Sequence, residues 1–274
     1  MLGYILTAED VLGYYGEERQ DIQQAIFRYG EHRETVVVMQ SSILGRGRGD
    51  GPGFRSPEQL LEIARMCLDD QESPVLRNYP AFHGTVGRYS PNGGIFRRTR
   101  ALVGTDMVFD IDVKTNYQEA FRQGMRITDF LDRYDVPYRV KFSGGSGPHI
   151  ILPYEVFPQP LSEAKFKRVF GLISTLSEAQ KVDGSFSSPT HFLRLPYSLN
   201  ENTGLASLPL NREQMESFEP GMAEIQNVEV DESWFELPED AQERMEKFFV
   251  DGLGFKKIKR KSAVEDDCSM RREE

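Results

Sequence analysis

The sequence predicts an α+β fold with largely antiparallel sheets. Segments with strand character and segments with helical periodicity follow one another without the regular βαβ alternation that builds a parallel sheet. The short turn "SPNGG" (residues 90–94) separates two segments of strand character, as in a hairpin of antiparallel strands. The sequence shows no internal repeat.

The first half of the chain is expected to begin with a helix. Thr7 to Asp10 has the spacing of a capping box, and the helical pattern runs toward Tyr29, with an interruption near Gly16 and an end at Gly30. The elements expected next are a strand at 34–40, a flexible glycine-rich loop at 45–53, a helix from Ser56-Pro57 and paired strands at 81–90 and 95–103.

The second half is expected to alternate single strands with long helices. These elements are a strand at 108–113, a helix at 118–134, strands at 138–143 and 149–153, a helix at 162–180, and helices near 211–218 and 239–250. We expect three regions: a folded core over 1–215, a C-terminal helical extension over 216–261 and a disordered tail over 262–274.

Composition limits the classes of protein that the chain can belong to. Its 274 residues have no apolar run near the ~20 residues of a membrane span, and the N-terminus lacks a basic leader, so a cytoplasmic protein without membrane partners is expected. Cys67 and Cys268 are too far apart in the sequence for a disulfide framework or a cysteine-built zinc site. The net charge of −10 does not favour nucleic-acid binding, but basic residues cluster at 46–55, 88–100 and 256–261.

The strand "VFDIDV" (108–113) places two acids within an otherwise apolar segment. Side chains of an extended chain alternate between faces, so Asp110 and Asp112 point the same way. Two carboxylates this close repel each other unless a cation compensates them, and a divalent metal is the obvious candidate. The alternative is a strand end at which both acids reach solvent.

The segment "FSGGSGPHI" (142–150) leaves one strand at Ser143 and enters another at His149. The glycines between them allow successive backbone N–H groups to face one point, which is the arrangement that binds phosphate oxygens. The alternative is a glycine-rich hairpin whose histidine only packs. Two residues farther along also have alternatives: Asp183 with Gly184 fits an Asx turn, and Arg194 in an apolar segment fits a structural salt bridge.

Together these segments resemble the archaeo-eukaryotic primase superfamily. "VFDID", "FSGGSGPHI", Asp183 and "HFLRLPYSLNENTGL" are similar to its successive motifs, in the same order. "HRETVVV" and "GFRSPEQL" resemble segments upstream of them, so that the resemblance covers roughly residues 17–210. The superfamily includes the primase small subunit, the polymerase domain of ligase D and stand-alone primase-polymerases. The fold that the resemblance implies is a catalytic core of mostly antiparallel mixed sheets flanked by helices.

The resemblance also implies roles for single residues. The acids would bind two Mg²⁺ or Mn²⁺ ions, and the other residues would hold the triphosphate of an incoming nucleotide. The expected metal ligands are Asp110, Asp112 and Asp183, and the expected nucleotide ligands are Ser143, Gly144, Gly145, Ser146, Gly147, His149, Arg194, Arg33 and Lys141.

The chain departs from the superfamily in three places. Relatives carry basic residues where this chain has Gly145 and Ser146, so the grip on the nucleotide would rest more on backbone N–H groups, Lys141 and Arg194. Asn200 replaces a histidine or arginine, which puts recognition of phosphate or sugar there in doubt. Two distant cysteines cannot build the zinc module that many primase small subunits carry.

The expected activity is a metal-dependent nucleotidyltransferase, a primase or primase-polymerase that adds nucleoside triphosphates to a 3′-hydroxyl on a DNA template. One alternative is an end-joining repair polymerase that fills gaps or overhangs, and another is a catalytically silent nucleic-acid-binding module. The sequence leaves open whether chains are started de novo, whether ribo- or deoxynucleotides are used, whether the role is in replication or repair, and which partner proteins take part.

Overall fold

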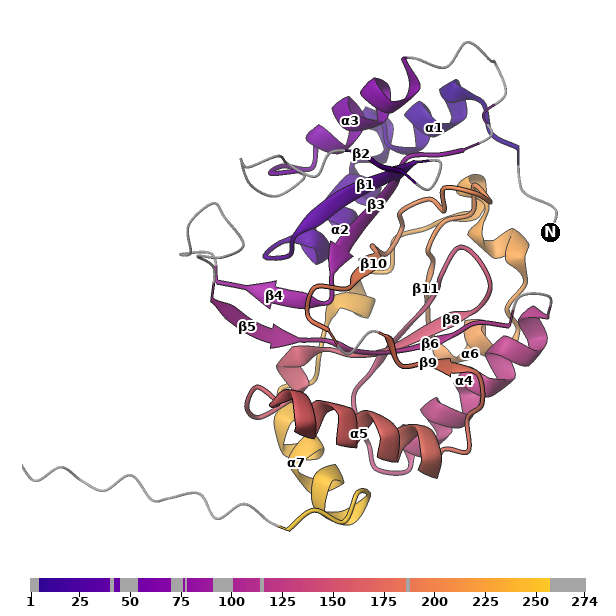
Figure 1. Cartoon of the computed structure of the whole chain (residues 1–274). Helices are drawn as coiled ribbons and strands as arrows, with labels where there is room; N and C mark the ends of the chain where they lie inside the picture. The colour runs from indigo at the N-terminus through magenta and orange to yellow at the C-terminus, as the bar shows by residue number, and fades with distance from the viewer. Residues whose placement is uncertain are drawn as a thin grey trace, which may run out of the picture.

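The computed structural model describes residues 5–39, 42–44, 54–69, 76, 78–90, 101–113, 116–185 and 188–256. Within them the expected α+β fold is confirmed: the strands form a four-stranded sheet, a five-stranded sheet and a two-stranded ribbon, and every strand pair is antiparallel (Figure 1). The expected glycine-rich loop 45–53, the residues 91–100 and the tail 262–274 lie outside the described residues.

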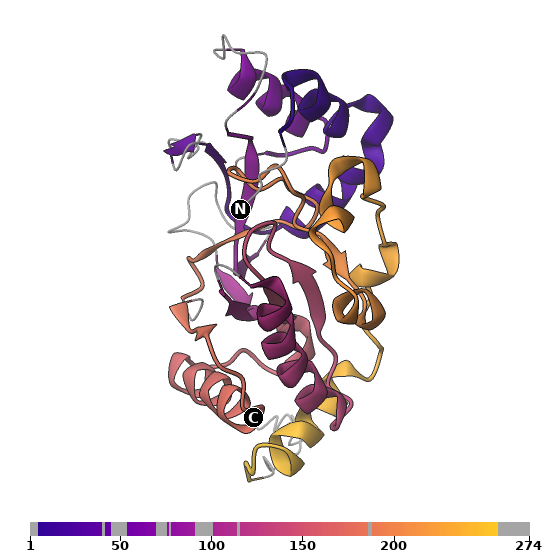
Figure 2. The ribbon, with the colours of Figure 1, turned by 90° about the vertical axis from the view of Figure 1, so that its right-hand side faces the viewer.

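The four-stranded sheet has the order β10-β3-β1-β2. Its strands are β10 (Phe192–Arg194), β3 (Ala81–Thr85), β1 (Thr35–Met39) and β2 (Ser42–Leu44). Three N-terminal helices pack on it, and Figure 2 shows them grouped at one end of the molecule: α1 (Ala8–Tyr14), α2 (Gln20–Gly30) and α3 (Gln59–Leu68).

The start and the end of the first helical region follow the sequence signals. Thr7 and Asp10 form the expected capping box, and the interruption at Gly16 is a short 3₁₀ helix, η1 (Glu17–Arg19), between α1 and α2. α2 ends at Gly30, as expected, and packing requires a small residue there, because a Cβ would lie 3.0 Å from the ring of Phe54.

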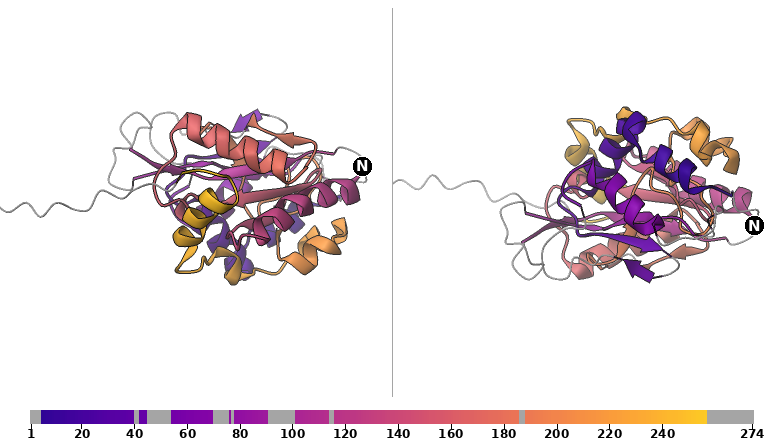
Figure 3. Two further views of the ribbon diagram at one scale, coloured as in Figure 1. Left: turned by 90° about the horizontal axis from the view of Figure 1, so that it is seen from below. Right: turned by 90° about the horizontal axis from the view of Figure 1, so that it is seen from above.

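The five-stranded sheet has the order β11-β7-β8-β6-β9. Its strands are β11 (Pro209–Leu210), β7 (Arg139–Phe142), β8 (Pro148–Leu152), β6 (Met107–Ile111) and β9 (Val182–Asp183). Two long helices, α4 (Tyr117–Asp132) and α5 (Glu163–Leu176), lie against one face of this sheet (Figures 1 and 3). Phe109 of β6 stacks on Phe170 of α5 with ring centroids 4.7 Å apart, so the apolar side of the strand with the two acids faces the helices.

The two-stranded ribbon corrects one expectation. The segment 81–90 is not a single strand: it divides at Val86 into β3 and β4 (Gly87–Tyr89), which belong to different sheets. β4 pairs with β5 (Leu102–Thr105). Val86 is fully buried between the sheets. Its backbone N–H donates to the carbonyl of His191 and not to a strand that pairs with β4, so the chain bends at this residue.

The C-terminal region packs into the same hydrophobic core as the rest of the described chain. The indole N–H of Trp234 donates a hydrogen bond to the carbonyl of Val140 on β7 at 2.7 Å. The remaining helices are η2 (Tyr154–Val156), α6 (Arg212–Glu216), the 3₁₀ helices η4 (Pro220–Ala223), η5 (Ile225–Asn227) and η6 (Glu232–Phe235), and α7 (Ala241–Asp251). No helix in the described part of the chain is long and apolar enough to cross a membrane.

Candidate active site

Four of the expected site residues form a straight row across the five-stranded sheet. Lys141 on β7 lies opposite His149 on β8, His149 lies opposite Asp110 on β6, and Asp110 lies opposite Asp183 on β9. Residues directly opposite each other in an antiparallel ladder project from the same face with Cβ atoms about 4.5–5.5 Å apart. Three strand pairings therefore bring these four side chains, here called the polar row, to one face of the sheet.

Asp112 follows the polar row at the end of β6, one residue beyond Ile111. Asp110 is half-buried, Ile111 is fully buried and Asp112 is exposed, which is the alternation expected of an extended chain. Asp112 thus continues the side on which Asp110 lies, toward solvent.

Burial changes steadily along the polar row. Lys141 is fully buried, His149 is 5% exposed, the Asp110 side chain is 21% exposed and Asp183 lies at the surface. The carboxylates are therefore at the open end, at the β9 edge of the sheet, and the basic side chains are at the closed end.

Burial shifts the pKa values of the residues at the closed end of the polar row. Burial and the charge of Lys141 lower the pKa of His149 to about 4, and burial holds the pKa of Lys141 itself well below its ordinary range. His149 Nε2 lies 3.2 Å from Oδ1 of Asp110. Burial alone raises the pKa of Asp110, but contact with His149 and the positive charges nearby outweigh it, so this pKa lies below its ordinary value.

The glycine loop (residues 143–147) closes over the end of β6. The backbone N–H groups of Gly145 and Gly147 converge on the hydroxyl of Ser143, at 3.2 and 3.4 Å, so the serine oxygen lies at the point on which they converge. Gly147 has to be glycine, because a Cβ there would lie 2.0 Å from the carbonyl oxygen of Ile111. The loop therefore sits directly beside the strand that carries the two acids.

Arg194 reaches this site from the four-stranded sheet. Its guanidinium donates to the carbonyl of Ser143 and pairs with the carboxylate of Glu201, so it has the structural salt bridge that the sequence left as an alternative. These two contacts hold the guanidinium of Arg194 beside Ser143, at the start of the glycine loop.

Sequence reasoning missed His83. This residue lies opposite Arg194 in the ladder between β3 and β10, and its Nε2 is 4.0 Å from Glu201. Burial and the charges of Arg194, Lys141 and His149 hold its pKa well below the ordinary range. No motif marks it; its position at the centre of an expected strand was the available signal.

Two other residues have structural partners. Arg33, expected at the nucleotide phosphates, is 2% exposed and donates to Oδ2 of Asp106 at 2.5 Å and to the carbonyls of Tyr29 and Thr85. The structure does not bring it to the polar row, because the buried carboxylate of Asp106 needs its charge. The Oδ1 of Asn200 accepts hydrogen bonds from the two backbone N–H groups of Asn202 and Thr203, so it holds a turn.

The expected metal ligands fit a hard divalent cation by donor type, since all three are carboxylates. The backbone brings Asp110 and Asp183 to opposite positions, but the carboxylate of Asp183 accepts hydrogen bonds from the N–H and the hydroxyl of Ser185, at 2.8 and 2.9 Å. Across the described residues, no three His, Cys, Asp or Glu side chains are grouped closely enough to hold a metal ion. Backbone position and chemistry fit the metal, and the carboxylates would have to turn toward it.

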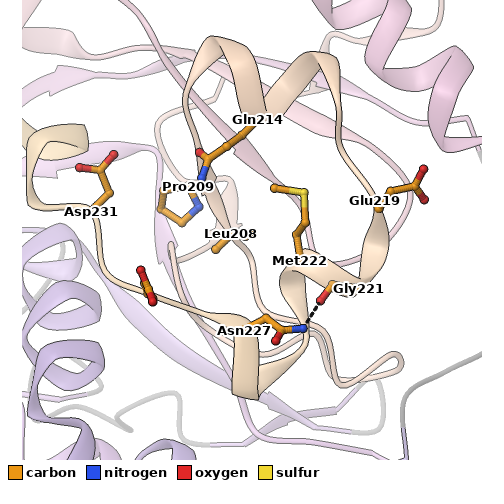
Figure 4. Close-up of a pocket in the computed structure, with 9 residues that line it drawn as sticks. Leu208, Pro209, Gln214, Glu219, Gly221, Met222, Asn227 and Asp231 are labelled. Carbon is orange, nitrogen blue, oxygen red and sulfur yellow. Dashed lines mark hydrogen bonds between the residues drawn. The ribbon is translucent and has the colours of Figure 1, made fainter.

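A pocket of about 410 Å³ lies at the opposite edge of the same sheet, beside β11 and α6 (Figure 4). Pro209 and Met222 line its apolar part, and its carboxylates come from Glu219, Glu229 and Asp231. Negative charge of this density repels phosphate, so this pocket does not suit a polyphosphate ligand.

No protein-family model matches the sequence, and no curated protein matches it either. Among solved structures, the polymerase domain of ligase D from Mycobacterium tuberculosis in complex with DNA is similar over 80% of this chain and 86% of that chain, with a TM-score of 0.57 and 14% sequence identity. At this identity the likeness concerns the fold. The chain therefore has the fold of the ligase D polymerase domain, the primase-polymerase fold that its motifs led us to expect.

Proposed function

We propose that the protein is a metal-dependent nucleotidyltransferase that adds nucleotides to a 3′-hydroxyl on a DNA template. The observation that carries the proposal is the position of Asp183 directly opposite Asp110 and in line with His149 and Lys141. Two acids from distant segments lie opposite each other at the open end of a row whose buried end carries basic side chains, and Asp112 follows the first of them in the chain. This arrangement supports one site for metal ions and an anionic substrate.

The three carboxylates would hold two divalent ions, Mg²⁺ or Mn²⁺. When bound, such ions lower the pKa of an attacking hydroxyl and neutralise a leaving pyrophosphate. Asp110 is kept ionised by its surroundings, and His149 holds one of its oxygens, which leaves the other oxygen to turn toward a ligand. Asp112 and Asp183 are exposed, so core packing does not restrict their rotation, and Asp183 would exchange its hydrogen bonds with Ser185 for a metal ion.

The triphosphate would lie between the glycine loop and the cationic groups of the two sheets. Burial and the neighbouring basic groups Arg194, Lys141 and His149 disfavour protonation of His83, and its lowered pKa reflects this repulsion. An anion placed among them relieves this repulsion and raises their pKa values, so the cluster favours a polyphosphate. The N–H groups of Gly145 and Gly147 would exchange the Ser143 hydroxyl for a phosphate oxygen.

DNA is the nucleic acid that we propose as template and primer. The similar solved structure is a polymerase domain of ligase D in complex with DNA, and this likeness supports DNA over RNA as the template. It also favours a repair polymerase that fills gaps or overhangs as the second candidate function, because that protein's polymerase domain is joined to a ligase.

One observation supports the silent-module alternative. The carboxylate of Asp183 is engaged by Ser185 in an Asx-type turn, and the carboxylates of the described chain are not gathered for a metal. Incorporation of labelled nucleotide separates the two: an enzyme incorporates it only with Mg²⁺ or Mn²⁺, and a silent module incorporates none.

The experiment incubates purified protein with an unprimed single-stranded template, a primed template and a 5′-phosphorylated gap, each with ribo- or deoxynucleotides and with Mg²⁺, Mn²⁺ or EDTA. The proposal expects metal-dependent extension of the primed template that is lost in Asp110→Ala and Asp112→Ala. A product on the unprimed template identifies a primase, and a preference for the gap identifies a repair polymerase. No incorporation on any substrate would overturn the proposal.

A further inference from the structure

The chain crosses from the four-stranded to the five-stranded sheet through residues 197–207, here called the connector hairpin. It follows β10 and precedes β11, and Figure 1 draws it in orange beside the two sheets. The N–H of Tyr197 donates to the carbonyl of Ser207 at 2.7 Å, and the N–H of Asn200 donates to the carbonyl of Leu205 at 2.8 Å. These bonds close the hairpin on itself.

The connector hairpin is also fixed from behind by α1 and the residue after it. The hydroxyl of Tyr14 donates to the carbonyl of Tyr197 at 2.8 Å, and the N–H of Leu199 donates to the hydroxyl oxygen of Tyr15 at 2.9 Å. Both tyrosines are buried. The hairpin is therefore a rigid support and not a free loop.

Side chains of the connector hairpin hold three groups of the proposed nucleotide site. The hydroxyl of Thr203 donates to the carbonyl of Gly144 at 2.6 Å. The hydroxyl of Ser207 accepts from the ammonium of Lys141 at 2.7 Å. Glu201 pairs with Arg194. Thr203 and Ser207 are 7% and 0% exposed, so these hydroxyls act through the groups that they hold.

The contact of Thr203 has a direct consequence for the glycine loop. A peptide group is planar, so the carbonyl of Gly144 and the N–H of Gly145 point in opposite directions from one rigid plane. A bond that holds this carbonyl also aims that N–H, which converges with the N–H of Gly147 on the Ser143 oxygen. Gly144 has φ of +78°, where glycine has no Cβ to restrict the plane, so the loop needs an external contact to define it.

We propose that the connector hairpin is a positioning element of the nucleotide site and that Thr203 is the positioning residue that aims the N–H groups of the glycine loop. This inference rests on the proposed function. In this role Thr203 keeps the glycine loop in one conformation, although it lies 59 positions from Gly144 in the chain and touches no substrate.

The experiment compares Thr203→Val, which keeps the shape but removes the hydroxyl, with Thr203→Ser, which retains it. The matched control is Thr128→Val, a fully buried threonine on α4 whose hydroxyl bonds to Met125 and Arg212. Two quantities are measured: amide hydrogen exchange over residues 143–149 in the free protein, and kcat and KM for the incoming nucleotide on a primed template.

We expect faster exchange of the loop amides only in Thr203→Val, with a rise in nucleotide KM of about three- to tenfold and a smaller change in kcat, as the loss of one aiming hydrogen bond allows. Thr203→Ser should restore both quantities, and Thr128→Val should change neither. Loop exchange and KM equal to wild type in Thr203→Val, or faster exchange with unchanged KM, would overturn the positioning role while the proposed function stands. An inactive wild type would overturn the proposed function, and the inference with it.

Discussion

Asp183 lies directly opposite Asp110 in the ladder between β9 and β6, although α4, β7, β8 and α5 separate them in the chain. An edge strand of two residues is enough to place the third carboxylate beside the first. The geometry makes Asp183 the most sensitive test of the proposed active site, because its side chain is exposed and supports no core contact.

Asp183→Asn should lower metal-dependent nucleotide incorporation by at least about 10²-fold, because a neutral amide cannot replace a carboxylate that holds a divalent ion. Asparagine still accepts the hydrogen bond from the Ser185 N–H, so the melting temperature should remain that of wild type. Asp129→Asn, which changes an α4 acid paired with Arg212, is the control and should keep full activity. Equal incorporation by Asp183→Asn and wild type would remove Asp183 from the site.

His149→Ala should weaken nucleotide binding, because it removes the group that holds Asp110 and faces the proposed triphosphate. The loss of a hydrogen bond to a charged group predicts a rise in nucleotide KM of about 10- to 100-fold. His32→Asn, which alters an exposed histidine beside Glu31, is the matched control. Steady-state kinetics at varied nucleotide concentration measures both, and an unchanged KM in His149→Ala would count against the assignment.

Gly147→Ala should separate the glycine loop from β6. The new Cβ would lie 2.0 Å from the carbonyl oxygen of Ile111, so the backbone must move, at a cost of about 1–3 kcal/mol in the free energy of unfolding. Incorporation should fall with it. Gly171→Ala in α5 is the control: a Cβ there meets nothing within 4 Å, and alanine in a helix should stabilise by about 0.5–1 kcal/mol. Urea unfolding measures the change in the free energy of unfolding of both variants, and a Gly147→Ala variant as stable as wild type would contradict the prediction.

Asp106→Asn should destabilise the protein by about 3–5 kcal/mol at pH 7, because it leaves the buried guanidinium of Arg33 without its counter-charge. Tyr29→Phe, which removes only the phenol hydrogen bond to the same carboxylate, should cost about 1 kcal/mol. Urea unfolding measures both. A loss in Asp106→Asn no larger than in Tyr29→Phe would show that the ion pair does not stabilise this core.

The same pair gives the stability a pH dependence. Burial raises the pKa of Asp106, but Arg33 outweighs it, so the folded pKa lies below the ordinary value. Below about pH 4 the unfolded chain binds a proton that the folded chain does not, so this stabilisation is complete above pH 4 and is lost as the pH falls through the folded pKa. The stability difference between wild type and Asp106→Asn should therefore shrink below about pH 4 in urea titrations. A constant difference down to pH 2 would contradict this.

The features that depend on neighbouring residues could be predicted from the sequence. The capping box at Thr7, the alternation around Asp110, and the glycine loop between two strands depend on residues close in the chain, and the structure has each of them. The long helices followed from the same kind of signal. The strands of two or three residues between 181 and 210 did not, because such short segments carry no measurable periodicity.

Only the tertiary structure determined which side chains contact one another. The resemblance implied that Arg33 contacts phosphate, but Arg33 pairs with Asp106, because a buried carboxylate needs a counter-charge. His83 joins the site only through its ladder to Arg194, and Thr203 reaches Gly144 only through the connector hairpin. These contacts join residues far apart in the chain, and their choice depends on how two sheets pack, which no local pattern encodes.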